Sequence, residues 1–178
     1  MRNNRGFTLI EMIVVTVILI TLMSVAIPQL AKTVESSRAH DAVGVLNAVG
    51  SGVRMFRSDW SSSAITPSTA LTTTINTTAC PAGGKPTSVG GLLGCKYIQP
   101  QNWDNLRYAF YVCESGAPTG TCCVNGAGEN RVACADRRDT DPESGSATSA
   151  AYKDWVYWID NYGGCHAVTT SQPPCPRV

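Results

Sequence analysis

The sequence predicts an α+β fold in which a long N-terminal α-helix, apolar in its first half and amphipathic in its second, packs on a small antiparallel β-sheet in a disulfide-rich globular head. Three observations indicate this class: an uncharged apolar run near the N-terminus, a stripe of apolar residues at helical spacing after it, and short later segments rich in β-branched and aromatic residues. The length of 178 residues suits one ordinary domain with an appendage.

The first element is a helix long enough to span a membrane. Twenty consecutive residues, Met12 to Ala31, carry no formal charge. As a helix they extend about 30 Å, which is the thickness of the hydrocarbon layer of a bilayer. Arg2 and Arg5 precede this run, and basic flanks stay on the cytoplasmic side. The sequence after Lys32 is therefore expected outside the cytoplasm.

The second element continues this helix to about Trp60 with one apolar face. Apolar residues recur there at three- and four-residue spacing, with charged residues between them, so this face is expected to pack on the globular part. Gly44, Gly50 and Gly52 lie in the same stretch, and each weakens a helix by up to about 1 kcal/mol relative to Ala. The apolar stripe consists of Ala42, Val45, Leu46, Val49, Val53, Phe56 and Trp60.

The rest of the chain, residues 61–178, is the expected head. Residues 61–78 are rich in Ser and Thr and predict a loop. Its sequon, Asn76-Thr77-Thr78, is a match that arises readily by chance in such a Thr-rich stretch. Three segments bounded by turn-forming residues predict the strands of an antiparallel sheet, Leu106 to Val112, Asn130 to Ala135 and Trp155 to Ile159.

Eight cysteines, two histidines and no C-x-x-C pair favour disulfides in an oxidising compartment over a cytosolic zinc site. Eight cysteines allow 105 connectivities, so the pairing stays open. Short loops favour Cys80 with Cys95 and Cys165 with Cys175. The adjacent residues Cys122 and Cys123 need separate partners, so the remaining four, Cys113, Cys122, Cys123 and Cys134, are expected to pair among themselves.

Glu11 is the one charge inside the apolar stretch. A lone carboxylate near the bilayer interior costs roughly 3 kcal/mol on insertion scales, so such a residue normally has a partner or a function. The neighbours at i+3 and i+4, Val14 and Val15, cannot compensate the charge. The partner is therefore expected to come from another chain.

The run Arg5-Gly6-Phe7-Thr8-Leu9-Ile10-Glu11-Met12-Ile13-Val14-Val15 resembles the N-terminal signature of type IV pilins and of type II secretion pseudopilins. The resemblance implies that a prepilin peptidase cuts between Gly6 and Phe7 and that the new N-terminal Phe7 is methylated. Glu11 is then the fifth residue of the mature chain, which in this family is thought to neutralise the N-terminal ammonium of a neighbouring subunit. Pro28 matches the helix-loosening proline of the family, and Ile20 stands in the stretch where many members have glycine.

The resemblance also implies an organisation and a role. Residues 1–6 form a leader, 7–31 the transmembrane and filament-core helix, 32–60 the amphipathic helix that continues into the head, and 61–178 the head. The chain is then a subunit of an extracellular type IV pilus-like helical filament, resident in the inner membrane before assembly. Its expected partners are copies of itself, the prepilin peptidase, the inner membrane and the pilus or secretion assembly machinery; no cofactor is expected. The Cys165–Cys175 pair resembles the disulfide-bounded loop of many pilins.

Two alternatives remain open at this point. The chain could be a pseudopilin of a type II secretion system, acting in a periplasmic pseudopilus, because the two N-termini are indistinguishable. It could also be a secreted disulfide-rich binding domain or enzyme with an ordinary signal peptide, cut after Ser24-Val25-Ala26. Glu11 and the Gly-Phe-Thr-Leu-Ile-Glu run disfavour the second alternative.

Charge and motifs exclude several function classes. Fourteen basic and thirteen acidic residues give a net charge of +1, and loss of the leader with Arg2 and Arg5 changes it to −1, so no specific nucleic acid is predicted as a partner. The sequence holds no HExxH, no G-x-S-x-G and no P-loop, so we expect no enzymatic activity. His166 follows Cys165, but that cysteine is expected in a disulfide rather than in a catalytic dyad.

A short acidic cluster is the remaining candidate site. Its side chains, Asp136, Asp139, Asp141 and Glu143, could hold calcium through oxygen ligands. A solvated loop is the favoured interpretation of such a run, and the neighbouring Arg137 and Arg138 would oppose a cation. No resident metal is therefore expected.

Overall fold

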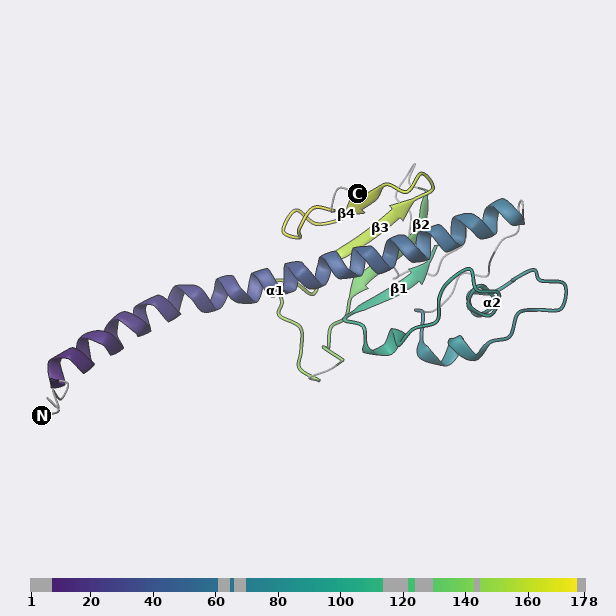
Figure 1. Ribbon diagram of the computed structural model, residues 1–178. Coiled ribbons are helices and arrows are strands. Elements are labelled where there is room, and N and C mark those ends of the chain that lie inside the picture. Colours follow the sequence, from purple (N-terminus) through teal and green to yellow (C-terminus); the bar gives the residue numbers. More distant parts are fainter. Residues whose placement is uncertain are drawn as a thin grey trace, which may run out of the picture. The chain divides into compact units, whose positions relative to one another are not determined.

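The computed structural model describes residues 8–60, 65, 70–113, 122–123, 130–142 and 145–175. Its elements follow the order α1, η1, α2, η2 and β1 to β4 (Figure 1). The helical elements are α1 (Leu9–Asp59), η1 (Thr73–Thr77), α2 (Val89–Gly94) and η2 (Trp103–Asn105), and the strands are β1 (Tyr108–Val112), β2 (Arg131–Arg137), β3 (Val156–Asp160) and β4 (Cys165–Ala167). The chain divides into two compact units, Met1–Ser37 and Arg38–Val178.

The four strands form one antiparallel sheet in the order β1-β2-β3-β4. Three of them begin and end within two residues of the predicted strands, which confirms the expected α+β class. The register of β2 against β3 shifts between Arg131 and Ala133, as at a β-bulge. β4 was not predicted, because Cys-His-Ala is too short for a pattern and is a strand only through its pairing with β3.

The core of the second unit lies between α1 and the sheet. The predicted stripe is largely right: Leu46, Val49, Val53 and Phe56 are fully buried, whereas Val45 and Trp60 lie at the margin of the core. The buried row also includes Ala39 and Val43. On the sheet side the largest buried side chains are Tyr108, Phe110, Tyr157 and Ile159.

Two of the three helix glycines let other backbone or side chains approach α1 closely. A Cβ at Gly52 would lie 2.2 Å from the Tyr97 carbonyl oxygen, and a Cβ at Gly50 would lie 3.3 Å from Ile159 Cγ2. A Cβ at Gly44 would meet nothing within 4 Å. Gly50 and Gly52 therefore lower the helix propensity but permit close packing against α1, whereas Gly44 lowers the helix propensity without permitting any such contact.

The segments before the sheet are joined by side-chain hydrogen bonds. The Asn76 amide donates to the Gln101 carbonyl at 2.7 Å, and its oxygen accepts from Trp103 Nε1 at 2.9 Å. The Asp104 carboxylate accepts from the Thr73 amide at 2.8 Å, which holds the pKa of Asp104 below its usual value. Because the nitrogen and the oxygen of the Asn76 amide are both hydrogen-bonded, the asparagine of the sequon has a structural role in this structure.

The Gln172 side chain attaches the C-terminal tail to β3, because it forms hydrogen bonds with the strand backbone as a neighbouring strand would. Gln172 is 6% exposed, accepts from the Val156 amide at 2.9 Å and donates to the Val156 carbonyl at 2.6 Å. The Tyr157 hydroxyl donates to the Pro173 carbonyl at 3.1 Å. A disulfide joins Cys165 to Cys175. The tail therefore satisfies the Val156 N–H and adds a second donor to the Val156 carbonyl, which also accepts from the Val168 amide at 3.1 Å.

Candidate functional site

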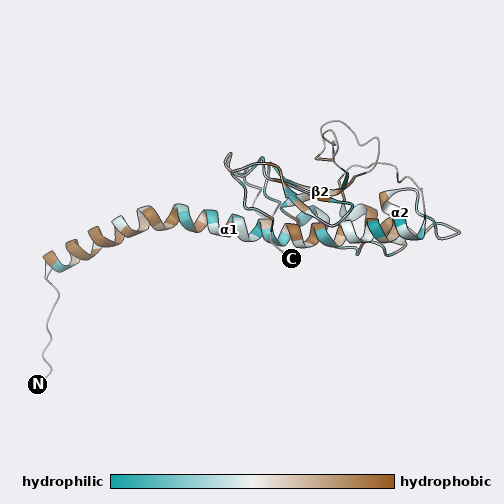
Figure 2. Ribbon diagram, turned by 90° about the horizontal axis from the view of Figure 1, so that it is seen from above, coloured by the Kyte–Doolittle hydropathy of each residue, from teal (hydrophilic) through white to brown (hydrophobic). Residues whose placement is uncertain are grey.

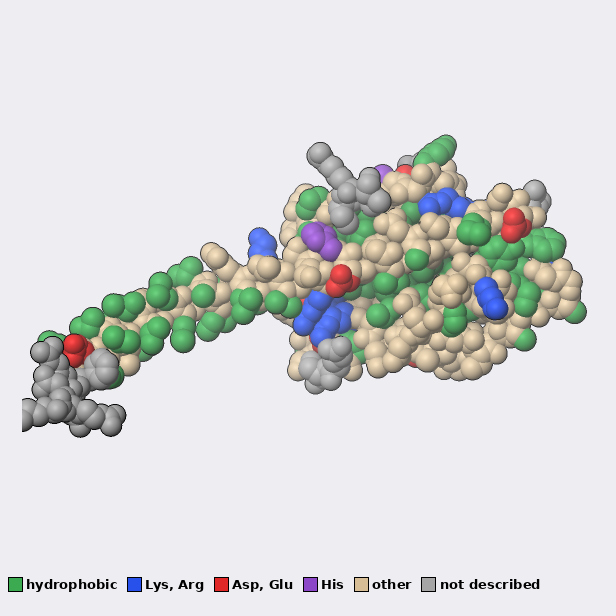
Figure 3. Space-filling view, viewed as in Figure 1, with side chains coloured by type: hydrophobic (Ala, Val, Ile, Leu, Met, Phe, Trp, Pro, Cys, Tyr) green, Lys and Arg blue, Asp and Glu red, His purple; other side chains and the backbone are tan. Residues whose placement is uncertain are grey.

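The N-terminal part of α1 presents apolar side chains all round. Fifteen large apolar side chains between Leu9 and Leu30 are 48–77% exposed. Figure 2 shows this stretch almost uniformly hydrophobic, and Figure 3 shows apolar side chains covering its visible face. Within the described residues, α1 is the one helix long and apolar enough to cross a membrane. A helix that is hydrophobic all round needs a lipid or a protein environment.

The hydroxyl side chains of this stretch are satisfied within the helix. Thr16 donates to the Ile13 carbonyl at 2.9 Å, and Thr21 donates to the Ile18 carbonyl at 2.8 Å. Ser24 donates in the same way to the carbonyl three residues before it. These side chains therefore add no unpaired donor when the helix leaves water.

Glu11 takes part in a hydrogen-bonded box at the start of α1. Its Oε2 accepts from the Thr8 amide and from the Thr8 hydroxyl, each at 2.9 Å, and its own amide donates to Thr8 Oγ1 at 3.3 Å. Thr8 is thus the N-cap and Glu11 the third helical residue of a capping box. Thr8 was not among the predicted partners of Glu11, although Thr-x-x-Glu before an apolar run is the known signal of a capping box.

The box does not balance the charge of Glu11. Thr8 supplies two neutral donors, and both reach the same carboxylate oxygen. A buried carboxylate still needs a cation, because hydrogen bonds alone do not offset the cost of desolvating a charge. The expectation of a cationic partner from another chain therefore stands as a prediction.

α1 continues through Pro28 without a break in its helical assignment. Local unwinding at this residue, which the sequence suggested, is not seen in this structure. Proline has no N–H, so the carbonyl four residues earlier, at Ser24, loses its usual helical donor. Gly6 and Phe7, the expected cleavage and methylation residues, lie outside the described residues.

Four disulfides join the eight cysteines. They link Cys80 to Cys95, Cys113 to Cys123, Cys122 to Cys134, and Cys165 to Cys175. Each closes a loop of 10 to 15 residues in sequence separation, as the preference for local pairs implies. The two middle bridges lie against each other under Trp158. In the chain-entropy model such loops each add roughly 3 kcal/mol.

Among the described residues, one group of three or more potential metal-ligating side chains has its ligand atoms within 4.8 Å of one another: Cys113, Cys123 and Cys134. All three are disulfide-bonded. Their sulfurs are therefore not available as thiolates, which is the form that binds zinc.

The acidic cluster is not brought together around one point. Asp136 and Asp139 line a polar cavity, whereas Asp141 forms an ion pair with Arg107. Glu143 lies outside the described residues. Burial, with the charges of Asp139 and Asp154, raises the pKa of Asp136 to about 6. This carboxyl group is therefore a strained charge at neutral pH rather than part of a formed cation site.

His166 belongs to a structural network and not to a dyad with Cys165. Its ring stacks on Trp158 with centroids 3.9 Å apart, and its Nε2 lies 3.0 Å from Asp160 Oδ2. Arg131 covers the same Trp158 ring at 4.9 Å. Cys165 is bonded to Cys175, so no free thiol stands beside the imidazole.

The comparisons with known proteins agree with the N-terminal site. Residues 1–27 match the model of the prokaryotic N-terminal methylation motif, the signature of type IV pilins and pseudopilins. Neither the comparison with curated proteins nor that with solved structures found a match. The motif implies processing by a prepilin peptidase, and together with the apolar helix it implies membrane insertion and export. With the α+β fold it supports a chain of the pilin and pseudopilin kind, whose members are typically non-enzymatic structural subunits.

Proposed function

We propose that this chain is a structural subunit of an extracellular type IV pilus-like filament, assembled through the N-terminal part of α1. The observation that carries the proposal is the exposed apolar surface of that helix, most of which lies within the matched methylation motif. Fifteen half-exposed large apolar side chains represent on the order of 10 to 20 kcal/mol of unfavourable contact with water. Outside the bilayer, only burial against other copies of the same helix removes this cost.

Such burial leads to a filament when copies pack head to tail, because a heterologous contact that does not close on itself propagates. Apolar contact is non-directional, so it fixes no stagger between the helices. Glu11 supplies the direction: Thr8 holds one carboxylate oxygen, and the ammonium created at Phe7 of a neighbouring copy compensates the charge. Misaligned helices leave both ions buried without partners, which is heavily penalised.

Glu11→Ala and Glu11→Gln test this role. Glu11→Gln keeps the size of the side chain and an oxygen for the Thr8 donors, and it removes the charge. We expect both variants to be cut after Gly6 and methylated on Phe7, as read by mass spectrometry of the N-terminus, with sheared filament yield reduced at least tenfold. A normal yield from either variant would exclude the charge as the register element.

The same measurements on the unmodified chain test the broader proposal. A mature N-terminus at methylated Phe7 with surface fibres containing the chain supports the filament. An N-terminus at Ile27 supports a secreted domain with an ordinary signal peptide. Loss of enzyme secretion after deletion, with no surface fibres in the parent cells, assigns the chain to a pseudopilus.

A further inference from the structure

Among the described residues of the second unit, Tyr162 has the highest exposed fraction of the large hydrophobic side chains. It sits in the turn between β3 and β4 with 94% of its surface accessible. Large aromatic side chains are normally at least partly covered, and exposed aromatics are enriched among the residues that dominate interfaces. Tyr162 is therefore suited to a contact with another molecule.

The turn that carries Tyr162 is held rigid. Asp160 Oδ1 accepts from the Tyr162 amide and from the Gly164 amide, each at 2.8 Å. The Asp160 carbonyl accepts from the Gly163 amide at 3.1 Å and from Arg54 Nη1 at 3.4 Å. Gly163 has a φ of +89°, which a residue with a side chain rarely adopts. A pre-ordered aromatic loses little conformational entropy when it binds.

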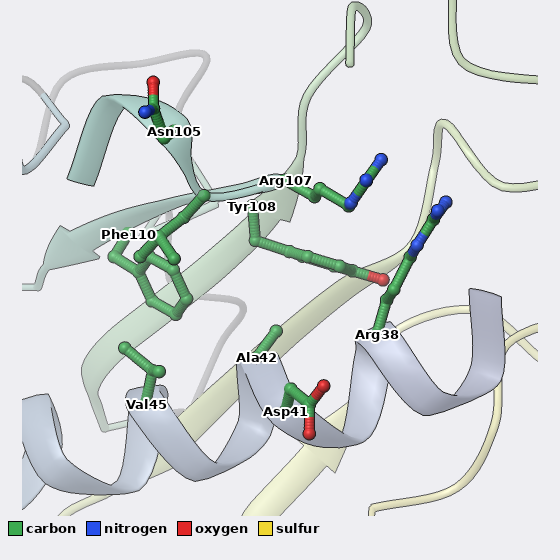
Figure 4. A pocket seen from close by; sticks show the side chains of 9 residues that line it. Arg38, Asp41, Ala42, Val45, Asn105, Arg107, Tyr108 and Phe110 are labelled. Carbon is green, nitrogen blue, oxygen red and sulfur yellow. The ribbon is translucent and has the colours of Figure 1, made fainter. Parts of the chain in front are cut away.

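A cavity of about 190 Å³ opens between α1 and the start of β1 in the same unit. Its α1 wall consists of Arg38, Asp41, Ala42 and Val45, and its opposite wall includes Arg107 and Phe110. Figure 4 shows the two guanidinium groups on one side of this cavity and Val45 and Phe110 on the other. An aromatic ring with a hydroxyl group suits this lining, because the ring can pack on the apolar side and also face a cation.

The turn and the cavity lie at opposite ends of the same stretch of α1. Arg54 binds the turn, and Arg38 lines the cavity sixteen residues earlier. Sixteen helical residues correspond to about 24 Å. A molecule therefore cannot place its own Tyr162 in its own cavity, whereas a second copy displaced along the helix direction can. Such a contact joins two different surfaces, so it is heterologous, and it propagates into a filament when the rotation between copies does not close a ring.

We propose that Tyr162 of one copy inserts into the cavity between α1 and β1 of the next copy. The ring packs against Val45 and Phe110, and its face lies beside the guanidinium of Arg38. The hydroxyl lies within reach of Asp41 and Asn105. This contact rests on the proposed filament: α1 supplies the apolar association, and the Tyr162 contact fixes how successive second units stack.

The first test replaces Tyr162 by the photo-crosslinking amino acid p-benzoylphenylalanine in the full chain, expressed in cells that form filaments. Irradiated filaments are sheared, digested and analysed by mass spectrometry. We expect the dominant crosslinked peptides to join residue 162 to residues 38–45 or 105–110 of another copy. Crosslinks confined to other segments of this chain, or made mainly to a different protein, would overturn the proposal, as would the absence of any crosslink in filaments that form normally.

The second test compares Tyr162→Ala with Tyr162→Phe, and blocks the cavity mouth with Asn105→Trp, an exposed position. We expect Tyr162→Ala and Asn105→Trp to lower filament yield at least tenfold and Tyr162→Phe to lower it less than threefold. Val168→Ala, at a residue 51% exposed outside both surfaces, is the matched control and should assemble normally. Melting of each variant in micelles must equal that of the parent chain.

These results separate the two proposals. If Glu11→Ala abolishes filaments while Tyr162→Ala leaves them unchanged, the filament stands and the Tyr162 contact is wrong. If the parent chain forms no filament or pseudopilus, the filament proposal itself fails. Loss of filaments in Tyr162→Ala with full retention in Asn105→Trp would exclude this cavity as the receptor.

Discussion

Replacing Asp136 by Asn should stabilise the protein at neutral pH and leave it unchanged in acid. Asp136 is a half-buried carboxyl group on β2, and burial is the main cause that raises its pKa to about 6 from 3.8, with Asp139 and Asp154 adding repulsion. A difference of 2.2 pH units corresponds to about 3 kcal/mol at 1.36 kcal/mol per unit. Solvent screens the exposed part of the group, so we expect about 1 to 2 kcal/mol.

The sign follows from proton binding. Between pH 3.8 and about 6 the folded chain holds the Asp136 proton more tightly than the unfolded chain, so folding stability falls as pH rises through this interval. Below pH 3.8 both states are protonated and the penalty is absent. Above pH 6 the penalty is complete. Asn cannot ionise, and its oxygen still accepts from the Arg137 amide that bonds to Asp136.

The assay is urea unfolding of the full chain in detergent micelles with disulfides intact, at pH 4 and at pH 7.5. We expect the free energies of unfolding of parent and Asp136→Asn to differ by no more than about 0.5 kcal/mol at pH 4 and by about 1 to 2 kcal/mol in favour of the variant at pH 7.5. Taking the difference between the two chains cancels the contribution of titrating groups that do not interact with Asp136, whereas Asp139 and Asp154 belong to the measured effect. Equal stabilities at pH 7.5, or a variant less stable there, would refute the inference that the ionised Asp136 carboxylate destabilises the folded chain.

Two further predictions concern packing and the C-terminal tail. Gly52→Ala should destabilise the second unit by more than about 2 kcal/mol, since its Cβ would lie 2.2 Å from the Tyr97 carbonyl oxygen. Gly44→Ala should instead stabilise it by up to about 1 kcal/mol, because a Cβ there meets nothing within 4 Å. Thermal melting of both variants measures this contrast, and equal shifts in melting temperature would contradict the close approach at Gly52. Gln172→Ala should cost about 1 to 3 kcal/mol, because it leaves the Val156 N–H without its acceptor, whereas the Val156 carbonyl keeps the Val168 amide as a donor. Faster amide exchange at Val156 would localise the effect, and protection equal to the parent would contradict it.

The sequence was sufficient for features that depend on local pattern. The uncharged run predicts the apolar part of α1, and the three- and four-residue spacing predicts its buried face. Segments rich in β-branched and aromatic residues, bounded by turn-forming residues, predict three strands. The methylation signature is likewise a contiguous string of residues. Each of these signals is carried by neighbours in the chain, so one sequence contains all of the necessary information.

Features that depend on contacts between distant segments could not be predicted. Gln172 pairs with Val156 only because the tail returns to β3, and Gly52 matters only because residues 97–98 cross α1 there. The raised pKa of Asp136 needs the sheet around it. The Thr8–Glu11 box is different, since the Thr-x-x-Glu spacing at the start of the helix is a local signal and is sufficient to predict it.

This box changes what Glu11 requires of a neighbour. A buried carboxylate with no partner at all would take up a proton, and a neutral acid would not fix the stagger between neighbouring helices. Thr8 donates two hydrogen bonds to one oxygen of the carboxylate, and neither donor is a cation. The helix therefore holds a charged group that its own chain stabilises in part and cannot balance. In the proposed filament, the free amino terminus of a second copy supplies the missing cation. We therefore expect that removing the charge of Glu11 prevents assembly more effectively than removing any one of the surrounding apolar side chains.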